Sequence, residues 1–297
     1  MSDFGDSTGM QNPIFKIMKT QPDYFGKYKV IENLWETKYG ELLLVSRNDN
    51  KLFFLNKIEL ITNKTKTEIE KDINTINQIN SKYVIKIVEY FIHKIEEQEF
   101  ICIILNYYGN NLFNILHNPN LLPTDIIWKY FIQILFALNS LYLNNILPFN
   151  LLPDNIYIDQ NNNIKLAGFG ISLDILNKNK LVKDLLPYYS PEIIKGKTND
   201  QKNVLWSLGC ILYELAFKRR AFDNENYETL KSLIFGINYL IPDDYENELS
   251  LVISKLICEE NKRLSSFKEL LFDENIKYKL IETNTFYEIL KPNLQGK

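Results

Sequence analysis

Residues 155–170 read NIYIDQNNNIKLAGFG and contain two short runs of β-branched and aliphatic residues. The first run is 155–158 and the second is 164–167, and three consecutive asparagines at 161–163 separate them. Two short apolar runs on either side of a polar turn predict a β-hairpin. An irregular stretch follows the hairpin up to Glu192.

The residues before this hairpin are dominated by short runs of Val, Ile, Leu and Phe. Such runs, separated by polar turns, predict successive antiparallel strands. The five runs are 28–34, 41–46, 51–60, 84–91 and 100–107. Between the third and fourth runs, residues 65–80 carry isoleucines at helical spacing, which predicts a helix with one face against a core. These isoleucines are Ile69, Ile73, Ile76 and Ile79.

After residues 109–111 the periodicity becomes helical. Thr124 is expected to cap a long helix over 125–143, and several further helices extend to about Phe272. The change from strands to helices places a junction near residues 106–111.

These patterns predict an α+β fold with two lobes. Residues 23–106 form a small five-stranded antiparallel β lobe with one main helix, and residues 107–275 form a larger, mostly α-helical lobe. Residues 1–22 are polar and lack apolar periodicity, which predicts a mobile arm. Residues 276–297 form a C-terminal tail whose apolar residues either cap the large lobe or dock on a partner.

The composition excludes several classes of function. The 297 residues carry 34 Lys and Arg against 37 Asp and Glu, and this net charge of −3 argues against bulk attraction to nucleic acid or an anionic membrane. With two histidines and three widely spaced cysteines (Cys102, Cys210 and Cys258), we expect no metal site and buried, reduced thiols in a cytoplasmic protein. No run of about 18 uncharged apolar residues occurs, so we expect no transmembrane helix.

Four motifs in succession resemble those of eukaryotic protein kinases. The predicted hairpin and the GFG that follows resemble the stretch from the catalytic loop to the magnesium loop. Residues 187–192, PYYSPE, are similar to the peptide-positioning loop, and residues 206–215, WSLGCILYEL, resemble the helix called F in that family. Residues 261–264, NKRL, are placed like the family's late arginine. The PYY element and the residues after helix F most resemble the NIMA-related (Nek) kinases.

The resemblance implies phosphoryl transfer from ATP, which requires charged side chains at fixed positions. In this sequence those positions are degenerate. Asn56 replaces the phosphate-binding lysine, Asp72 replaces its glutamate partner, Asn150 replaces the catalytic base, Leu152 replaces the catalytic-loop lysine, and Gly168 replaces the magnesium-binding aspartate. Of the family's magnesium ligands, Asn155 is retained. An asparagine cannot accept a proton at neutral pH, and Mg²⁺ prefers carboxylates.

The remnant of the nucleotide cleft consists of Gly40, Phe54, Leu105, Asn155 and Tyr157. Phe54 stands where the family has a small residue against adenine, so we expect its ring to fill the adenine space with Tyr157 opposite. Trp35 and Thr37 replace two glycines of the phosphate-covering loop, and Trp35 would obstruct the phosphates. Lys57 follows Asn56, but the alternation of side chains along a strand predicts that it points away from the cleft.

The retained residues match structural positions of the family. They are Phe169, Gly170, Glu192, Trp206 and Arg263. Glu192 and Arg263 match a buried ion pair, and retaining both avoids an unpaired buried charge. Val204 replaces the helix F aspartate that ties down the catalytic loop, and Tyr188 and Tyr189 are expected to pack on their loop.

These substitutions predict a catalytically inactive pseudokinase that binds protein partners, with neither ATP nor Mg²⁺ as a cofactor. Two alternatives stay open: a nucleotide-binding switch without catalysis, and an ATP-binding protein whose residual or atypical activity uses Lys57 or Asp174. Resemblance to the Nek kinases implies a setting at microtubules, centrosomes or cilia.

Overall fold

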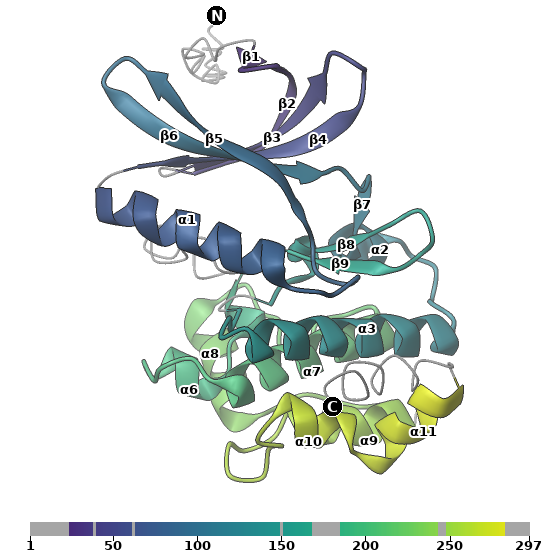
Figure 1. Cartoon of the computed structure of the whole chain (residues 1–297). Coiled ribbons are helices and arrows are strands. Elements are labelled where there is room, and N and C mark those ends of the chain that lie inside the picture. The colour runs from purple at the N-terminus through teal and green to yellow at the C-terminus, as the bar shows by residue number, and fades with distance from the viewer. Residues whose placement is uncertain are drawn as a thin grey trace, which may run out of the picture.

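The structure is a computed structural model that describes residues 24–37, 40–60, 63–148, 151–167, 185–242 and 248–282. The described chain forms two lobes (Figure 1). A twisted antiparallel sheet and one long helix form the N-terminal lobe. The C-terminal lobe is mostly helical and carries a small sheet on the side that faces the N-terminal lobe. The predicted α+β architecture is confirmed.

The large sheet has the strand order β1-β2-β3-β4-β6-β5. Its strands are β1 (Tyr24–Phe25), β2 (Tyr28–Thr37), β3 (Gly40–Arg47), β4 (Leu52–Glu59), β5 (Ile87–Ile95) and β6 (Gln98–Asn106). The sheet therefore has one strand more than predicted, because β1 has two residues and is too short to show a period in the sequence. Gly26, at φ 60°, supplies the left-handed turn that leads from β1 into β2.

The two faces of this sheet bury different cores. One face, with Phe54 and Ile58 of β4, joins a large cluster that extends through α1 (Asn63–Gln78) into the C-terminal lobe. The other face, with Phe53 and Leu55, packs on a smaller cluster beneath β1. The four isoleucines predicted to line one helix face are all buried in the large cluster, but α1 ends at Gln78, so Ile79 lies just after the helix.

The segment before β5 joins the two lobes. The predicted strand at 84–91 begins only at Ile87, because Val84 instead forms a parallel bridge with Leu166 of the C-terminal lobe. Two backbone hydrogen bonds, from Ile85 N to Leu166 O (2.9 Å) and from Leu166 N to Tyr83 O (2.8 Å), hold this contact. A hydrophobic run indicates a buried extended segment, but it does not indicate which sheet the segment joins.

The C-terminal lobe contains the hairpin that was predicted from residues 155–158 and 164–167. Strands β8 (Ile156–Ile158) and β9 (Ile164–Leu166) pair antiparallel as predicted, and β7 (Asn110–Asn111) adds to β8. The helices are α2 (Leu112–His117), α3 (Thr124–Leu143), α6 (Pro191–Ile194), α7 (Gln201–Phe217), α8 (Tyr227–Gly236), α9 (Glu248–Leu256), α10 (Phe267–Leu271) and α11 (Glu274–Glu282). The described part of the lobe also contains two 3₁₀ turns, η1 (Pro153–Asn155) and η2 (Leu186–Tyr188).

Helices α3 and α7 form the centre of this lobe. Helix α7 is buried almost throughout, as predicted for residues 204–217. An added Cβ at Gly209 would lie 2.7 Å from Leu256 Cβ, so glycine permits the close approach of α7 and α9. Helix α3 is long and apolar enough to be a candidate membrane span, but it carries Asp125 and Lys129, and 61% of its apolar window is buried inside the fold, as in the core helix of a globular protein.

Three local predictions need correction. Helix α3 begins at Thr124 itself, and Pro123 occupies the capping position without a side-chain hydrogen bond. The predicted boundary between lobe and tail at 275/276 falls inside α11, whose Ile276 and Leu280 are fully buried in the core. Cys258 is only half-buried, whereas Cys102 and Cys210 are buried, and all three thiols are free.

Candidate functional site

Strand β4 places Asn56 and Lys57 on opposite faces of the sheet. Asn56 lies on the same face as Phe54, between Leu42 and Ile103 of the neighbouring strands. The Lys57 ammonium group lies 2.9 Å from Glu41 Oε1 and 4.3 Å from the centre of the Phe100 ring. Both side chains of the Lys57–Glu41 pair are largely buried, so the charge of Lys57 is held on the outer face. The predicted orientation of Lys57 is confirmed.

Asp72 lies on α1 and is half-buried. Burial raises the pKa of its carboxyl group, the nearby Glu68 raises it further, and Lys71 opposes the shift. A carboxylate paired with a lysine would have its pKa lowered. Among the described residues, Asp72 forms no ion pair, so the lysine–carboxylate pair that kinase chemistry uses has no counterpart here.

An aromatic cluster occupies the space between the lobes. The ring of Phe54 from β4 lies 4.9 Å from the ring of Tyr157 from β8, measured between centroids and with an interplanar angle of 37°. Phe54 also contacts Tyr107 edge-on at 5.0 Å, and Tyr108 lies 6.2 Å from Tyr157. The contact predicted between Phe54 and Tyr157 is therefore present. A flat base inserted between two rings needs about 7 Å between them, twice the ordinary carbon–carbon contact of roughly 3.5 Å.

The members of this cluster are buried to different degrees. Phe54 and Tyr157 are 5% and 9% exposed, and burial raises the pKa of Tyr157 to about 12, with the Asp154 carboxylate adding to the shift. Tyr107 and Tyr108 follow directly after β6, where the chain passes between the lobes. The sequence analysis did not identify these two tyrosines, although two consecutive aromatics at a predicted lobe junction were a signal. Leu105 is in register with Phe54 and packs against the large core.

Among the described residues, the two motif positions on the C-terminal side of the cleft, Leu152 and Asn155, are apolar or neutral. Leu152, at the position of the catalytic-loop lysine, is 5% exposed and belongs to the hydrophobic core. Asn155 ends η1, is half-buried, and its carbonyl accepts a hydrogen bond from Ala167 N at 2.8 Å. Asn150, Gly168, Phe169 and Gly170 lie outside the described residues, as does Asp174. The backbone of Trp35 pairs with that of Leu42, and the backbone of Gly40 pairs with that of Thr37, both between β2 and β3.

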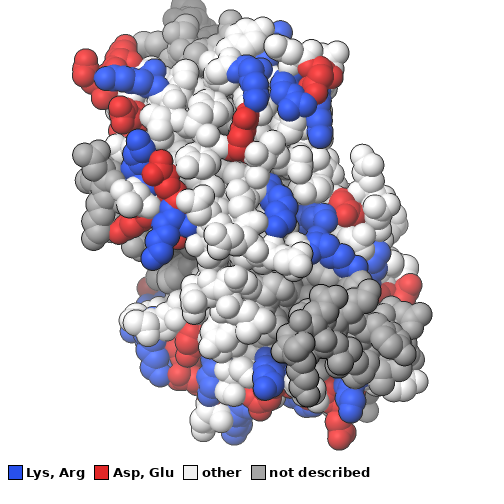
Figure 2. Space-filling model, in the orientation of Figure 1, with Lys and Arg blue, Asp and Glu red and all other residues white. Residues whose placement is uncertain are grey.

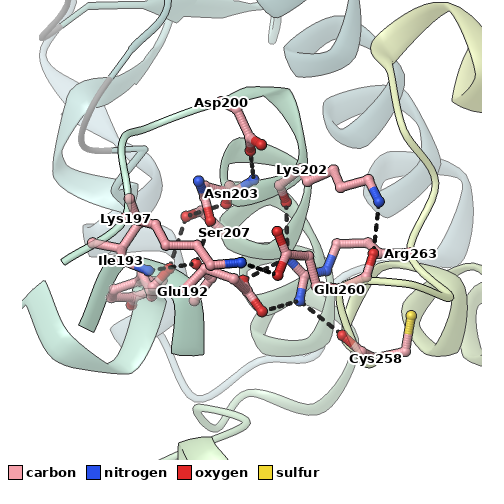
Figure 3. Close-up of polar contacts among 12 residues, drawn as sticks. Glu192, Ile193, Lys197, Asp200, Lys202, Asn203, Ser207, Cys258, Glu260 and Arg263 are labelled. Carbon is pink, nitrogen blue, oxygen red and sulfur yellow. Dashed lines mark hydrogen bonds and ion pairs between the residues drawn. The ribbon is translucent and has the colours of Figure 1, made fainter. Parts of the chain in front are cut away.

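A buried ion pair ties the peptide-positioning loop to the end of the lobe, as predicted. Figure 3 shows Arg263 reaching Glu192, with Nη1 and Oε2 3.0 Å apart. Arg263 also donates to the carbonyl oxygens of Lys202 (3.2 Å) and Cys258 (2.8 Å). Its guanidinium group lies over the fully buried Trp206 ring at 4.8 Å.

Tyr188 and Tyr189 were predicted to pack on their loop; Tyr188 is buried, but its side chain contacts α7. The Tyr188 hydroxyl donates a 2.6 Å hydrogen bond to Glu214 Oε2, and burial together with that carboxylate raises the pKa of Tyr188. Tyr189 is half-buried, and burial raises its pKa to about 12. Ser207 donates to the carbonyl of Tyr188 at 2.7 Å, which fixes the loop on α7.

A hydrogen bond that the sequence did not indicate holds the segment before the catalytic loop. Val204, which replaces the helix F aspartate, is buried and apolar. The side-chain amide of Asn199, just before α7, donates instead to the Pro148 carbonyl at 3.1 Å. The hydrogen bond that holds this segment thus comes from the neutral amide of Asn199, five residues before Val204 in the chain.

This fold and these motif positions are those of a protein kinase. The family model of the protein kinase domain matches residues 28–275, and the chain belongs to that family. Among curated proteins, the chain is similar to the probable serine/threonine-protein kinase nek2 of Dictyostelium discoideum, with 28% identity over 89% of this chain and 67% of that protein. It is also similar to the serine/threonine-protein kinase nekl-2 of Caenorhabditis elegans, with 28% identity over 72% of this chain and 62% of that protein.

Relatives outside the Nek group match at comparable identity. The carbon catabolite-derepressing protein kinase of Saccharomyces cerevisiae is 25% identical over 94% of this chain and 44% of that protein. The predicted resemblance to protein kinases, with Nek kinases among the relatives, is confirmed. This chain spans less than two thirds of the length of most of these relatives.

Proposed function

We propose that this chain is a pseudokinase that binds a protein partner and does not transfer phosphate. The contact between Phe54 and Tyr157 carries the proposal, because 4.9 Å between the two ring centres leaves no space for adenine. The kinase architecture persists around this closed cleft, including the buried pair of Glu192 and Arg263. A fold kept without its chemical groups is suited to present surfaces to a partner.

The distribution of charge supports the same proposal. Phosphoryl transfer relies on a lysine and metal ions to neutralise the phosphates. Lys57, which follows Asn56 in the chain, pairs with Glu41 on the opposite face of the sheet, and Leu152, at the position of the catalytic-loop lysine, is buried in the core. When catalytic residues act as a unit, removing one of them lowers the rate by about 10⁴–10⁶, as measured for a protease triad. Here several are replaced together.

The test is thermal unfolding of the chain with and without millimolar ATP and Mg²⁺, beside an assay of phosphate transfer to a protein acceptor. A ligand at about 100 times its Kd stabilises a protein by about 2.7 kcal/mol. For a chain of this size that is a shift in Tm of roughly 5–11 °C. We expect neither a shift nor transfer.

A clear shift without transfer would replace the pseudokinase proposal by a nucleotide-binding switch. Transfer that the Lys57→Ala variant abolishes would support the second candidate, an ATP-binding protein with atypical activity. The retained Asn155 and the names of the relatives, which are serine/threonine-protein kinases, are the observations in its favour.

We further propose, from the resemblance to Nek kinases, that the partner is associated with microtubules or cilia and that the chain acts in the cytoplasm or on the cytoskeleton. Co-sedimentation with polymerised tubulin, alone and with an extract of ciliated cells, checks this. Equal recovery in the pellet with and without polymer would count against it.

A further inference from the structure

A titratable cluster lies beneath β1, on the outer face of the large sheet. Figure 2 shows basic and acidic side chains next to one another on the surface of the N-terminal lobe, where salt screens their interactions. The cluster beneath β1 is more enclosed. It consists of Lys57 from β4 and Glu41 from β3, whose side chains are 8% and 14% exposed, and of the half-buried His93 from β5. Charges in such a place are screened much less than surface charges.

Strand β1 and the turn after it form a short strap over this cluster, and we call residues 24–27 the strap. Strand β1 pairs with β2 at two positions, Tyr24 with Lys29 and Phe25 with Tyr28. The ring of Phe25 is fully buried and belongs to the smaller cluster on the outer face. Because two residue pairs supply few backbone hydrogen bonds, the attachment of the strap depends on how well Phe25 is packed.

His93 is one of the side chains that hold Phe25 in place. The imidazole contacts the Phe25 ring edge-on, with 4.8 Å between the ring centroids and an interplanar angle of 62°. In the sheet, His93 lies directly opposite Phe100 of β6. The ammonium group of Lys57 lies over these same two rings, 5.5 Å from Phe25 and 4.3 Å from Phe100. An imidazolium formed at His93 would therefore stand close to a cation that is already buried.

The other titratable groups of this face do not offset that repulsion. Among the described residues, three carboxylates on the face have a partner other than His93: Glu41 with Lys57, Glu89 with Lys27 and Glu59 with Gln98. The phenol of Tyr28 and the thiol of Cys102 are neutral near pH 7, because burial raises both pKa values. Burial lowers the pKa of His93 below its ordinary value of 6.5, and the charge of Lys57 lowers it further.

We propose that the strap is an acid-sensitive latch, which is closed while His93 is neutral and released when His93 takes up a proton. The closed form holds fewer protons than the released form, so closure weakens as the pH falls. Histidine is the side chain that titrates near neutral pH, so release begins below about pH 6.5. Release withdraws Phe25 and uncovers the apolar side chains beneath it. This proposal is independent of whether the chain binds ATP.

The test is hydrogen exchange of the full chain, followed by mass spectrometry from about pH 7.5 to about pH 5, the range in which histidine titrates. Protection factors, which remove the intrinsic effect of pH on exchange, are compared for residues 24–30 and for α7. We expect the protection of residues 24–30 to fall several-fold on acidification. Protection of α7 should stay constant, because that helix is buried almost throughout.

Two matched variants assign the effect, since the chain has two histidines. His93→Phe keeps a ring against Phe25 but cannot be protonated, so residues 24–30 should stay protected at every pH. His117→Phe is the control, because His117 lies exposed on α2 and its ring contacts Phe113 instead. This control should show the full pH dependence of the unmodified chain.

If His93→Phe unfolds early in a thermal scan, the unmodified chain is titrated by NMR instead. The His93 ring signal should then titrate with a midpoint below about 6.5, and the signals of the strap should move with the same midpoint. Four results would overturn the proposal: constant protection of residues 24–30, equal pH dependence in both variants, loss of α7 protection together with the strap, or a His93 midpoint at or above that value. The pseudokinase proposal fails on other measurements, a Tm shift or phosphate transfer with ATP, so the two failures are distinguishable.

Discussion

Arg263 shows how a retained charge can serve the fold while the positions of the catalytic lysines, the catalytic base and the magnesium-binding aspartate are neutral. Its side chain is fully buried between Glu192 and the Trp206 ring and donates to two backbone carbonyls. A buried pair of charges adds little net stability over apolar residues, but removing one partner leaves the other charged and desolvated. The pair is thus expected to matter for folding, whatever the chain binds.

We expect Arg263→Ala to lower the free energy of unfolding by about 3–5 kcal/mol, because Glu192 would then be buried without a partner. Urea unfolding followed by circular dichroism measures this. The control is Lys197→Ala, which removes an exposed contact with Glu260 at 2.6 Å and should cost less than about 1 kcal/mol. If both substitutions lowered the free energy of unfolding equally, the buried pair would contribute no more to stability than an exposed one.

Strand β4 places the side chains of neighbouring residues on opposite faces of the sheet. Because side chains alternate along a strand, Phe54 lies in the cleft, whereas Phe53 and Lys57 lie on the outer face. The alternation was sufficient to predict the orientation of Lys57, since an extended strand offers two faces. The same reasoning failed for the segment at 84–91. There the strand that pairs with Val84 is β9, which lies some 80 residues further along the chain.

The two lobes are joined by side chains as well as by backbone. The aromatic contact between Phe54 and Tyr157 spans them, and the bridge between Val84 and Leu166 joins the N-terminal lobe to the small sheet of the other. A kinase that binds ATP fills this region with nucleotide. We infer that in this chain the rings of Phe54 and Tyr157 fill this space and connect the two lobes instead.

This coupling predicts the outcome of a double-mutant cycle. Phe54→Ala and Tyr157→Ala, singly and together, should give a coupling energy of about 0.5–1.5 kcal/mol in urea unfolding, the usual value for an aromatic pair. The control pairs Phe53→Ala with Tyr157→Ala. Phe53 contacts Tyr28 within its own lobe, so these two changes should add to within about 0.5 kcal/mol. Additivity in both cycles would contradict an aromatic link between the lobes.

Patterns that repeat over a few residues were predictable from the chain alone. The isoleucines of α1, the hairpin of β8 and β9, and the orientation of Lys57 all follow from helix or strand periods, which local backbone geometry imposes. The pair of Glu192 and Arg263 and the contact of Phe54 with Tyr157 were predictable through resemblance to a known fold. The positions of Asn150 and Gly168 remain predictions, because they fall outside the described residues.

The features that escaped prediction are contacts between distant segments. A period tells which face of an element is apolar, but it does not say which other element covers that face. Tyr107 and Tyr108 contact rings of both lobes at the cleft, and Asn199 contacts Pro148, 51 residues earlier in the chain, within the C-terminal lobe. Packing brings such segments together, since the burial of apolar side chains determines how distant elements meet.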